Sequence, residues 1–71
     1  MSIMNNGFAT INAKGANIIA RFDDAELVAV LHSNGFVALY AEDEGELMQM
    51  SHFRRNDNAD PMETAKTLMG L

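Results

Sequence analysis

The sequence predicts an α+β fold with the order ββαββα, in which a four-stranded antiparallel sheet carries two helices packed on one face. Asn6-Gly7-Phe8-Ala9 and Asn34-Gly35-Phe36-Val37 nearly repeat one motif, and each opens a strand-like run. Each run meets a glycine turn, at Lys14-Gly15 and at Glu44-Gly45. Each second strand then leads to a segment that begins at an aspartate, a residue that favours the start of a helix.

Size and charge restrict the class of protein. The 71 residues are expected to form one compact domain, 1–71, made of two ββα-like halves at about 6–35 and 36–70. A core this small leaves oligomerisation as one route to adequate stability. Ten acidic and five basic residues give a net charge of −5. This charge opposes a nucleic-acid partner, because phosphate binding relies on lysine and arginine, but it permits a basic protein partner.

The same composition predicts a cytoplasmic location. The chain has no cysteine, which suits a reducing compartment. The first residues lack the basic and apolar regions of a signal peptide, and no apolar run approaches the roughly 20 residues that a membrane span needs. We therefore expect no membrane partner.

The first predicted hairpin has Lys14-Gly15 as a two-residue turn. This turn places Ala13 opposite Ala16, and it also pairs Ile11 with Ile18 and Ala9 with Ala20. One face of the hairpin is then wholly apolar. A slip of one residue would move Asn17 onto that face, so the pattern favours this register.

The first predicted helix begins after Asp23. Asp23 and Glu26 have the spacing of a capping box, and Phe22 and Leu27 have that of a hydrophobic staple. Leu27, Val28, Val30 and Leu31 form a broad apolar stripe. Gly35 lies where the chain would leave the helix in a left-handed conformation.

The second predicted hairpin joins Phe36–Ala41 to Glu46–Phe53. A two-residue turn at Glu44-Gly45 pairs Ala41 with Met48, and a three-residue loop with a bulge is the alternative, because glutamate disfavours positive φ. A polar connection follows over 54–59. The second helix starts at Asp60-Pro61 and runs to about Met69, with Gly70 ending it.

These elements favour the strand order 2-1-3-4, with 1-2-3-4 as the second choice. Both helices would then cover one face and leave the other without a helix. That helix-free face is expected to carry Phe36, Tyr40 and Phe53, together with Phe8, Ile19 and Leu47. It is too apolar to lie comfortably in water, so it predicts a surface for a partner or a second copy.

The second hairpin also predicts an acidic tip. Four carboxylates occupy five positions there: Glu42, Asp43, Glu44 and Glu46. They would form a knob that enters a basic site, or a solvated turn that only protects the strand edge from aggregation. The methionines Met48, Met50, Met62 and Met69 are expected to fill the core, with an adaptable binding patch as the alternative.

The sequence predicts no enzyme, no cofactor site and no metal site. Ser51 and His52 are adjacent and would point to opposite faces of a strand, so they cannot form the hydrogen bond that activates a nucleophile. The glycines are dispersed and do not form a phosphate-binding loop. The spacing of the acidic tip also lacks the alternating ligands of a calcium loop.

In size and charge alone, the chain resembles small, acidic, cysteine-free proteins of phages and mobile elements. The resemblance implies an inhibitor that occupies the surface of a host enzyme or defence complex. We therefore expect a non-enzymatic protein-binding module whose candidate partner-binding residues are Glu42, Asp43, Glu44, Glu46, Phe36, Tyr40 and Phe53. The alternative is a structural protein that assembles with itself, and a homodimer is compatible with both hypotheses.

Overall fold

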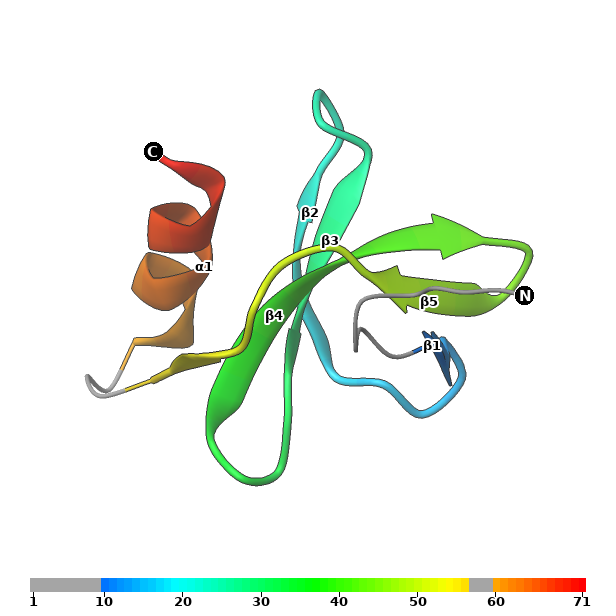
Figure 1. Ribbon diagram of the computed structural model, residues 1–71, viewed down its shortest axis with the longest axis horizontal. Coiled ribbons are helices and arrows are strands. Elements are labelled where there is room, and N and C mark those ends of the chain that lie inside the picture. Colours follow the sequence, from blue (N-terminus) through cyan, green and yellow to red (C-terminus); the bar gives the residue numbers. More distant parts are fainter. Residues whose placement is uncertain (1–9, 57–59) are drawn as a thin grey trace.

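The computed structural model describes residues 10–56 and 60–71. They form one antiparallel sheet and one short helix at the C-terminal end (Figure 1). The elements are β1 (Thr10–Asn12), β2 (Ile18–Phe22), β3 (Leu27–Leu31), β4 (Phe36–Asp43), β5 (Glu46–Gln49), β6 (Arg54–Arg55) and α1 (Pro61–Met69). The prediction of a four-stranded sheet with two helices is therefore wrong.

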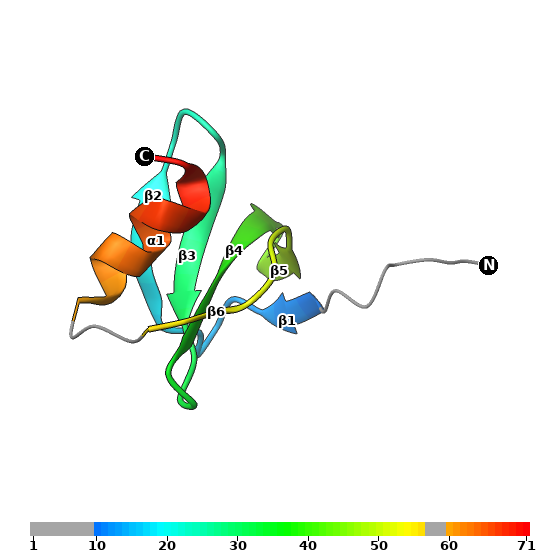
Figure 2. The ribbon, with the colours of Figure 1, turned by 60° about the vertical axis from the view of Figure 1, so that its left-hand side comes forward.

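The strand order is β1-β5-β4-β3-β2, and β6 pairs with β4 beyond the end of β5. Strands β2 to β5 are consecutive hairpins, whereas β1 adds at the far edge, beside β5. Helix α1 lies on one side of the sheet and β1 on the other in both ribbon views (Figures 1 and 2). The predicted order 2-1-3-4 and its alternative are both wrong.

The segment after Asp23 is a hairpin turn and a strand, not a helix. Phe22 pairs directly with Leu27, and Glu26 completes the four-residue turn with φ of 57°. Strand β3 is buried on both faces, since Val28, Ala29 and Val30 are all buried. A strand covered on both faces has a continuous apolar run, which is easily mistaken for a helical stripe.

Strand β1 pairs with β5 rather than with β2, so the first predicted hairpin is also wrong. Ile11 lies opposite Leu47, and Thr10 lies opposite Met48. A local turn does form at Lys14-Gly15, where the Ala16 N–H donates to the Ala13 carbonyl over 3.1 Å. The chain then leads away to the other edge of the sheet. Residues 6–9, including Ala9, lie outside the described residues.

The second hairpin has the predicted register. Ala41 lies opposite Met48, and Asp43 lies opposite Glu46 across a two-residue turn. Both turn residues have positive φ, 50° at Glu44 and 83° at Gly45, which is the combination of a type I′ turn. The glycine meets this requirement without cost, while the glutamate is held in a conformation that side chains disfavour.

Helix α1 confirms the predicted second helix. The Asp60 side chain accepts a hydrogen bond from the Met62 N–H, and Pro61 occupies the first turn. Gly70 ends the helix with φ of 83°, and the Leu71 N–H donates to the Lys66 carbonyl as in a Schellman motif.

Both faces of the sheet are covered by the chain itself at β3 and the first part of β4. On one face, α1 packs through Ala65 against Ala29, Val37 and Leu39. On the other, Ile11 from one sheet edge and Ile18 from the opposite edge pack against the same buried residues. The sheet therefore curls around a second core.

This curl overturns the prediction of a bare, helix-free face. Tyr40 and Leu47, which were placed on it, have no exposed surface. The physical reason is that β1 contributes Ile11 to this core, a contribution that the predicted pairing of β1 with β2 did not allow for.

Candidate functional site

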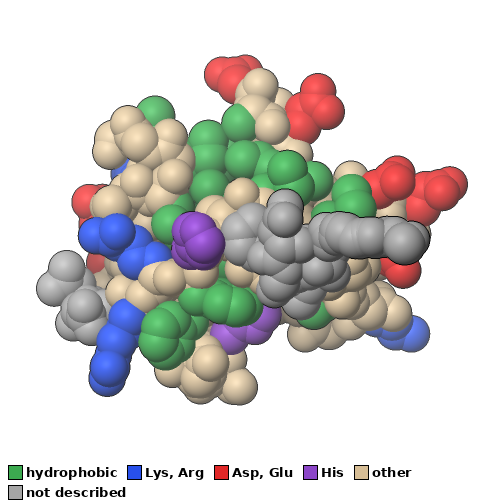
Figure 3. Space-filling view, viewed as in Figure 1, with side chains coloured by type: hydrophobic (Ala, Val, Ile, Leu, Met, Phe, Trp, Pro, Cys, Tyr) green, Lys and Arg blue, Asp and Glu red, His purple; other side chains and the backbone are tan. Residues whose placement is uncertain are grey.

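Two acidic hairpin tips lie at the same end of the sheet. Val28 of β3 pairs with Tyr40 of β4. The β2–β3 turn comes before Val28 and the β4–β5 turn comes after Tyr40, so in this antiparallel pair both turns lie toward the same end. Figure 3 shows the acidic side chains as separate groups at these turns. The tips carry seven of the ten acidic residues: Asp23, Asp24 and Glu26 in one, and Glu42, Asp43, Glu44 and Glu46 in the other.

The β4–β5 tip holds like charges against each other. Asp43 and Glu46 are directly opposite across the hairpin, and both are exposed. Like charges in this arrangement destabilise a hairpin. Among the described residues, the ion pair at these tips joins Glu42 to Arg21 over 2.9 Å, with both side chains well exposed. Such an exposed pair adds little stability. Arg21 balances one of the seven acidic charges, so the tips remain strongly negative.

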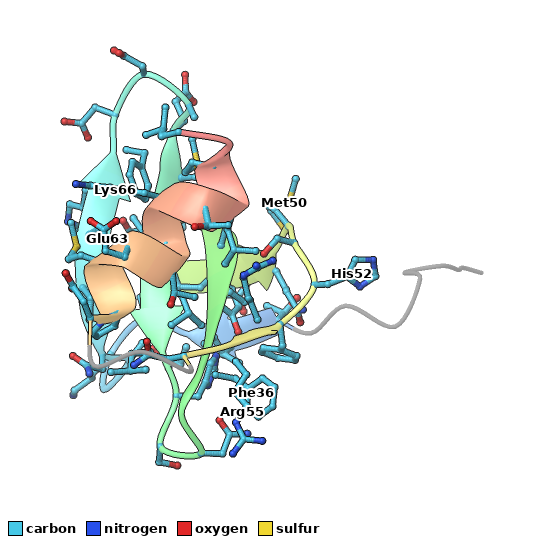
Figure 4. All side chains as sticks on the ribbon, turned by 90° about the vertical axis from the view of Figure 1, so that its left-hand side faces the viewer. Phe36, Met50, His52, Arg55, Glu63 and Lys66 are labelled. Atoms are coloured by element: carbon cyan, nitrogen blue, oxygen red, sulfur yellow. The ribbon has the colours of Figure 1, made fainter. Side chains whose placement is uncertain are left out.

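An exposed methionine patch adjoins this tip. Ala41, Met48 and Met50 share one side of the β4–β5 hairpin with Asp43 and Glu46. Met48 is 43% exposed and Met50 55% exposed, so they do not fill the core as expected. Figure 4 shows Met50 to one side of α1, and Figure 3 shows hydrophobic side chains between the two acidic groups. We call Ala41, Met48 and Met50, with the two acidic tips, the acidic–methionine face.

A polar kink after β5 positions Met50 and the residues that follow it. The Ser51 hydroxyl accepts a hydrogen bond from the Leu39 N–H over 2.9 Å, and the Met50 N–H donates to the Leu39 carbonyl. Gln49 Nε2 donates to the Ser51 carbonyl over 2.7 Å. These bonds satisfy the backbone of β4 where β5 stops pairing, and they direct the chain into β6.

The three predicted aromatic residues have different environments. Tyr40 is buried, and its hydroxyl lies 2.7 Å from Nε2 of His32. Burial raises the pKa of Tyr40 above its ordinary value. Phe53 is 50% exposed and meets the His32 ring edge-on, at a centroid distance of 5.3 Å. Phe36 is half-buried and lies opposite Arg55.

At the start of β4, Phe36, Arg55 and Phe53 lie on one side of the sheet, whereas Arg54 lies beside Val37 on the other side. We call these four residues, Phe36, Phe53, Arg54 and Arg55, the aromatic–arginine end. Arg54 and Arg55 form β6 beside the start of β4, and both are exposed. Sequence reasoning placed them in a polar connection, because a two-residue strand has no hydrophobic pattern of its own. Two aromatic residues were the available indication in the sequence: Phe36, which begins β4, and Phe53, which directly precedes β6.

A hollow lies away from the acidic tips, and Phe36, Phe53, Arg54 and Arg55 are not among the residues that line it. It has a volume of about 740 Å³ and lies between the β1–β2 connection and the β3–β4 turn. Its titratable lining side chains are Lys14 and His32, and His32 is already bonded to Tyr40. The remaining lining is Ile11, Asn12, Gly15, Ala16, Asn17, Val30, Leu31, Ser33, Gly35 and Asn56.

Within residues 10–56 and 60–71, no three histidine, aspartate or glutamate side chains are grouped so that they could hold a metal ion. In the same residues, no helix has the length and apolar character needed to cross a membrane. No protein-family model, curated protein or solved structure matches this chain.

Proposed function

We propose that this protein is a small, non-enzymatic binding module whose acidic–methionine face contacts another protein with a basic surface. It would act as an inhibitor by occupying that surface. The observation that carries the proposal is the concentration of seven of the ten acidic residues in two tips at one end of the sheet. Such a field attracts a basic partner and speeds its association.

The face also has features that stability alone does not favour. Asp43 opposes Glu46 across the tip, and Met48 and Met50 expose apolar surface to water. Both arrangements cost stability in the isolated chain, and a bound partner would relieve both. Methionine suits such a surface because its flexible thioether side chain adapts to the partner.

A matched pair of charge reversals tests the proposal. Glu46→Lys alters the acidic tip, and Glu63→Lys makes the same change in charge at an exposed position on α1. Each protein is used to capture partners from a lysate at physiological salt, and a captured protein is then purified and titrated against the baits.

We expect at least one saturable partner that binds the wild type and Glu63→Lys alike and binds Glu46→Lys about tenfold or more weakly. Equal binding by all three baits would remove the acidic tip from the interaction. Capture of no saturable partner would refute the function itself.

A further inference from the structure

We propose that the aromatic–arginine end is a second interaction surface and that its occupant is the acidic–methionine face of another copy of this chain. The protein would then associate head to tail. This inference goes beyond binding of a separate target, because it assigns a surface at the opposite end of the sheet and a partner of known chemistry.

The aromatic–arginine end has the composition of a contact surface. Phe53 exposes half of its surface, and Arg54 and Arg55 beside it are exposed. Phe36 and Arg55 are directly opposite across β4 and β6, and Figure 4 shows their side chains together at the same end of the molecule. Aromatic and arginine side chains are the types enriched in the energetic centres of protein interfaces.

The two surfaces cannot meet within one molecule. Phe36 begins β4 and Asp43 ends it, so the length of this strand, ~23 Å at the usual rise per residue, separates them. Figure 1 shows β6 beside one end of β4 and the β4–β5 turn at the other. When only one pair of unlike ends meets, the contact is heterologous and can continue from copy to copy.

The chemistry of the two ends is complementary. Arg54 of one copy would meet the opposed carboxylates Asp43 and Glu46 of the next, which offer the acceptors that a guanidinium binds best. A symmetric dimer through two acidic faces would instead bring carboxylates together, so charge favours contact between unlike ends.

A nucleic acid is the competing occupant of an aromatic and basic surface. The net charge of −5 and the two acidic tips repel a phosphate backbone. A second copy of the chain carries the required acidic and apolar groups itself, and the observations therefore favour self-association.

The test uses two variants, each with one altered end. Arg54→Glu disables the aromatic–arginine end, and the double variant Asp43→Lys/Glu46→Lys disables the acidic–methionine face. Lys14→Glu is the control, because it makes the same charge change as Arg54→Glu at an exposed turn. Circular dichroism and thermal unfolding establish that all variants are folded. Analytical ultracentrifugation then follows association as concentration increases.

We expect the wild type and Lys14→Glu to form dimers and longer species as concentration rises. Each end variant alone should associate about tenfold or more weakly. An equal mixture of the two end variants should regain association, because Arg54 of one variant meets the intact acidic face of the other, and the reversed charges at positions 54, 43 and 46 are again opposite in sign. Arg54→Glu should still bind the separate target, which distinguishes this inference from the proposed function.

Three results would overturn the inference. The first is a wild type that stays monomeric up to its solubility limit. The second is association that Arg54→Glu leaves unchanged. The third is binding of a fluorescently labelled thymidine decamer that Arg54→Glu abolishes without self-association, which would assign the surface to nucleic acid.

Discussion

His32 and Tyr40 are joined by a hydrogen bond of 2.7 Å between Nε2 and the phenolic oxygen, and it links the β3–β4 turn to the buried centre of β4. The hydroxyl of Tyr40 is thereby satisfied although the residue has no exposed surface. This bond also holds the ring against which Phe53 packs. The interior of the sheet and its aromatic–arginine end are therefore coupled through one histidine.

The buried phenol predicts a loss of stability at alkaline pH. Burial raises the folded-state pKa of Tyr40 above the unfolded value of about 10. The contribution of protonated Tyr40 to the free energy of unfolding is therefore fully present below the unfolded pKa. It is lost as pH rises through the folded pKa. Tyr40 is the single tyrosine in the chain, so the ultraviolet absorbance of tyrosinate reports its titration alone.

Tyr40→Phe serves as the comparison for this measurement. At neutral pH it should lower the free energy of unfolding by about 0.5–1.5 kcal/mol through loss of the bond to His32. Above pH 10, the difference from the wild type should shrink. A wild-type tyrosine that titrates like a free one would contradict the burial.

The strained turn residue predicts a stabilising substitution. Glu44 has φ of 50°, a conformation that asparagine adopts more readily. Glu44→Asn should raise the free energy of unfolding by about 0.5–1 kcal/mol in urea titrations. Glu44→Gln removes the same charge but does not relieve the strain of the positive φ. It should therefore raise the free energy of unfolding much less. Equal gains from both substitutions would show that charge, rather than φ, is the cause.

The alternation along β5 predicts opposite results at two adjacent residues. Leu47 has no exposed surface, whereas Met48 is 43% exposed. Leu47→Ala should lower the free energy of unfolding by about 2–5 kcal/mol, because it leaves a cavity in the core. Met48→Ala should change it by less than about 1 kcal/mol. Similar losses at both positions would argue that the methionine patch belongs to the core.

The polar kink after β5 predicts a cost for removing one hydroxyl. Ser51→Ala leaves the Leu39 N–H without its acceptor, and Leu39 is buried. The expected loss is about 1–3 kcal/mol in the free energy of unfolding. Ser33→Ala in the exposed β3–β4 turn is the control and should cost less than about 0.5 kcal/mol. A loss no larger than the control's would mean that water replaces the hydroxyl.

The parts of the fold that sequence reasoning found are those determined by neighbouring residues. Gly45 specifies the β4–β5 turn and with it the register of Ala41 with Met48. Asp60 and Gly70 specify the ends of α1. The position of the acidic tip followed from this turn, so it could be predicted as well.

The parts that it missed depend on contacts between distant segments. Leu27–Leu31 fits a helix and a doubly covered strand equally well, and α1 together with β1 decides for the strand. The turn at Lys14-Gly15 is real, yet Ile11 pairs with Leu47 of β5 and not with Ile18. Tyr40 was placed on a surface for the same reason, since the strand that closes over it was assigned to the wrong partner.

The pairing of β1 with β5 has a consequence for how the chain acquires its structure during synthesis. Strand β1 leaves the ribosome first, but its hydrogen-bonding partner among the described residues emerges only after β2, β3 and β4. Strands β2, β3 and β4 can pair as successive hairpins while Ile11 is still exposed to solvent. The second core is therefore sealed late, by a three-residue strand that must close the longest loop in the sheet.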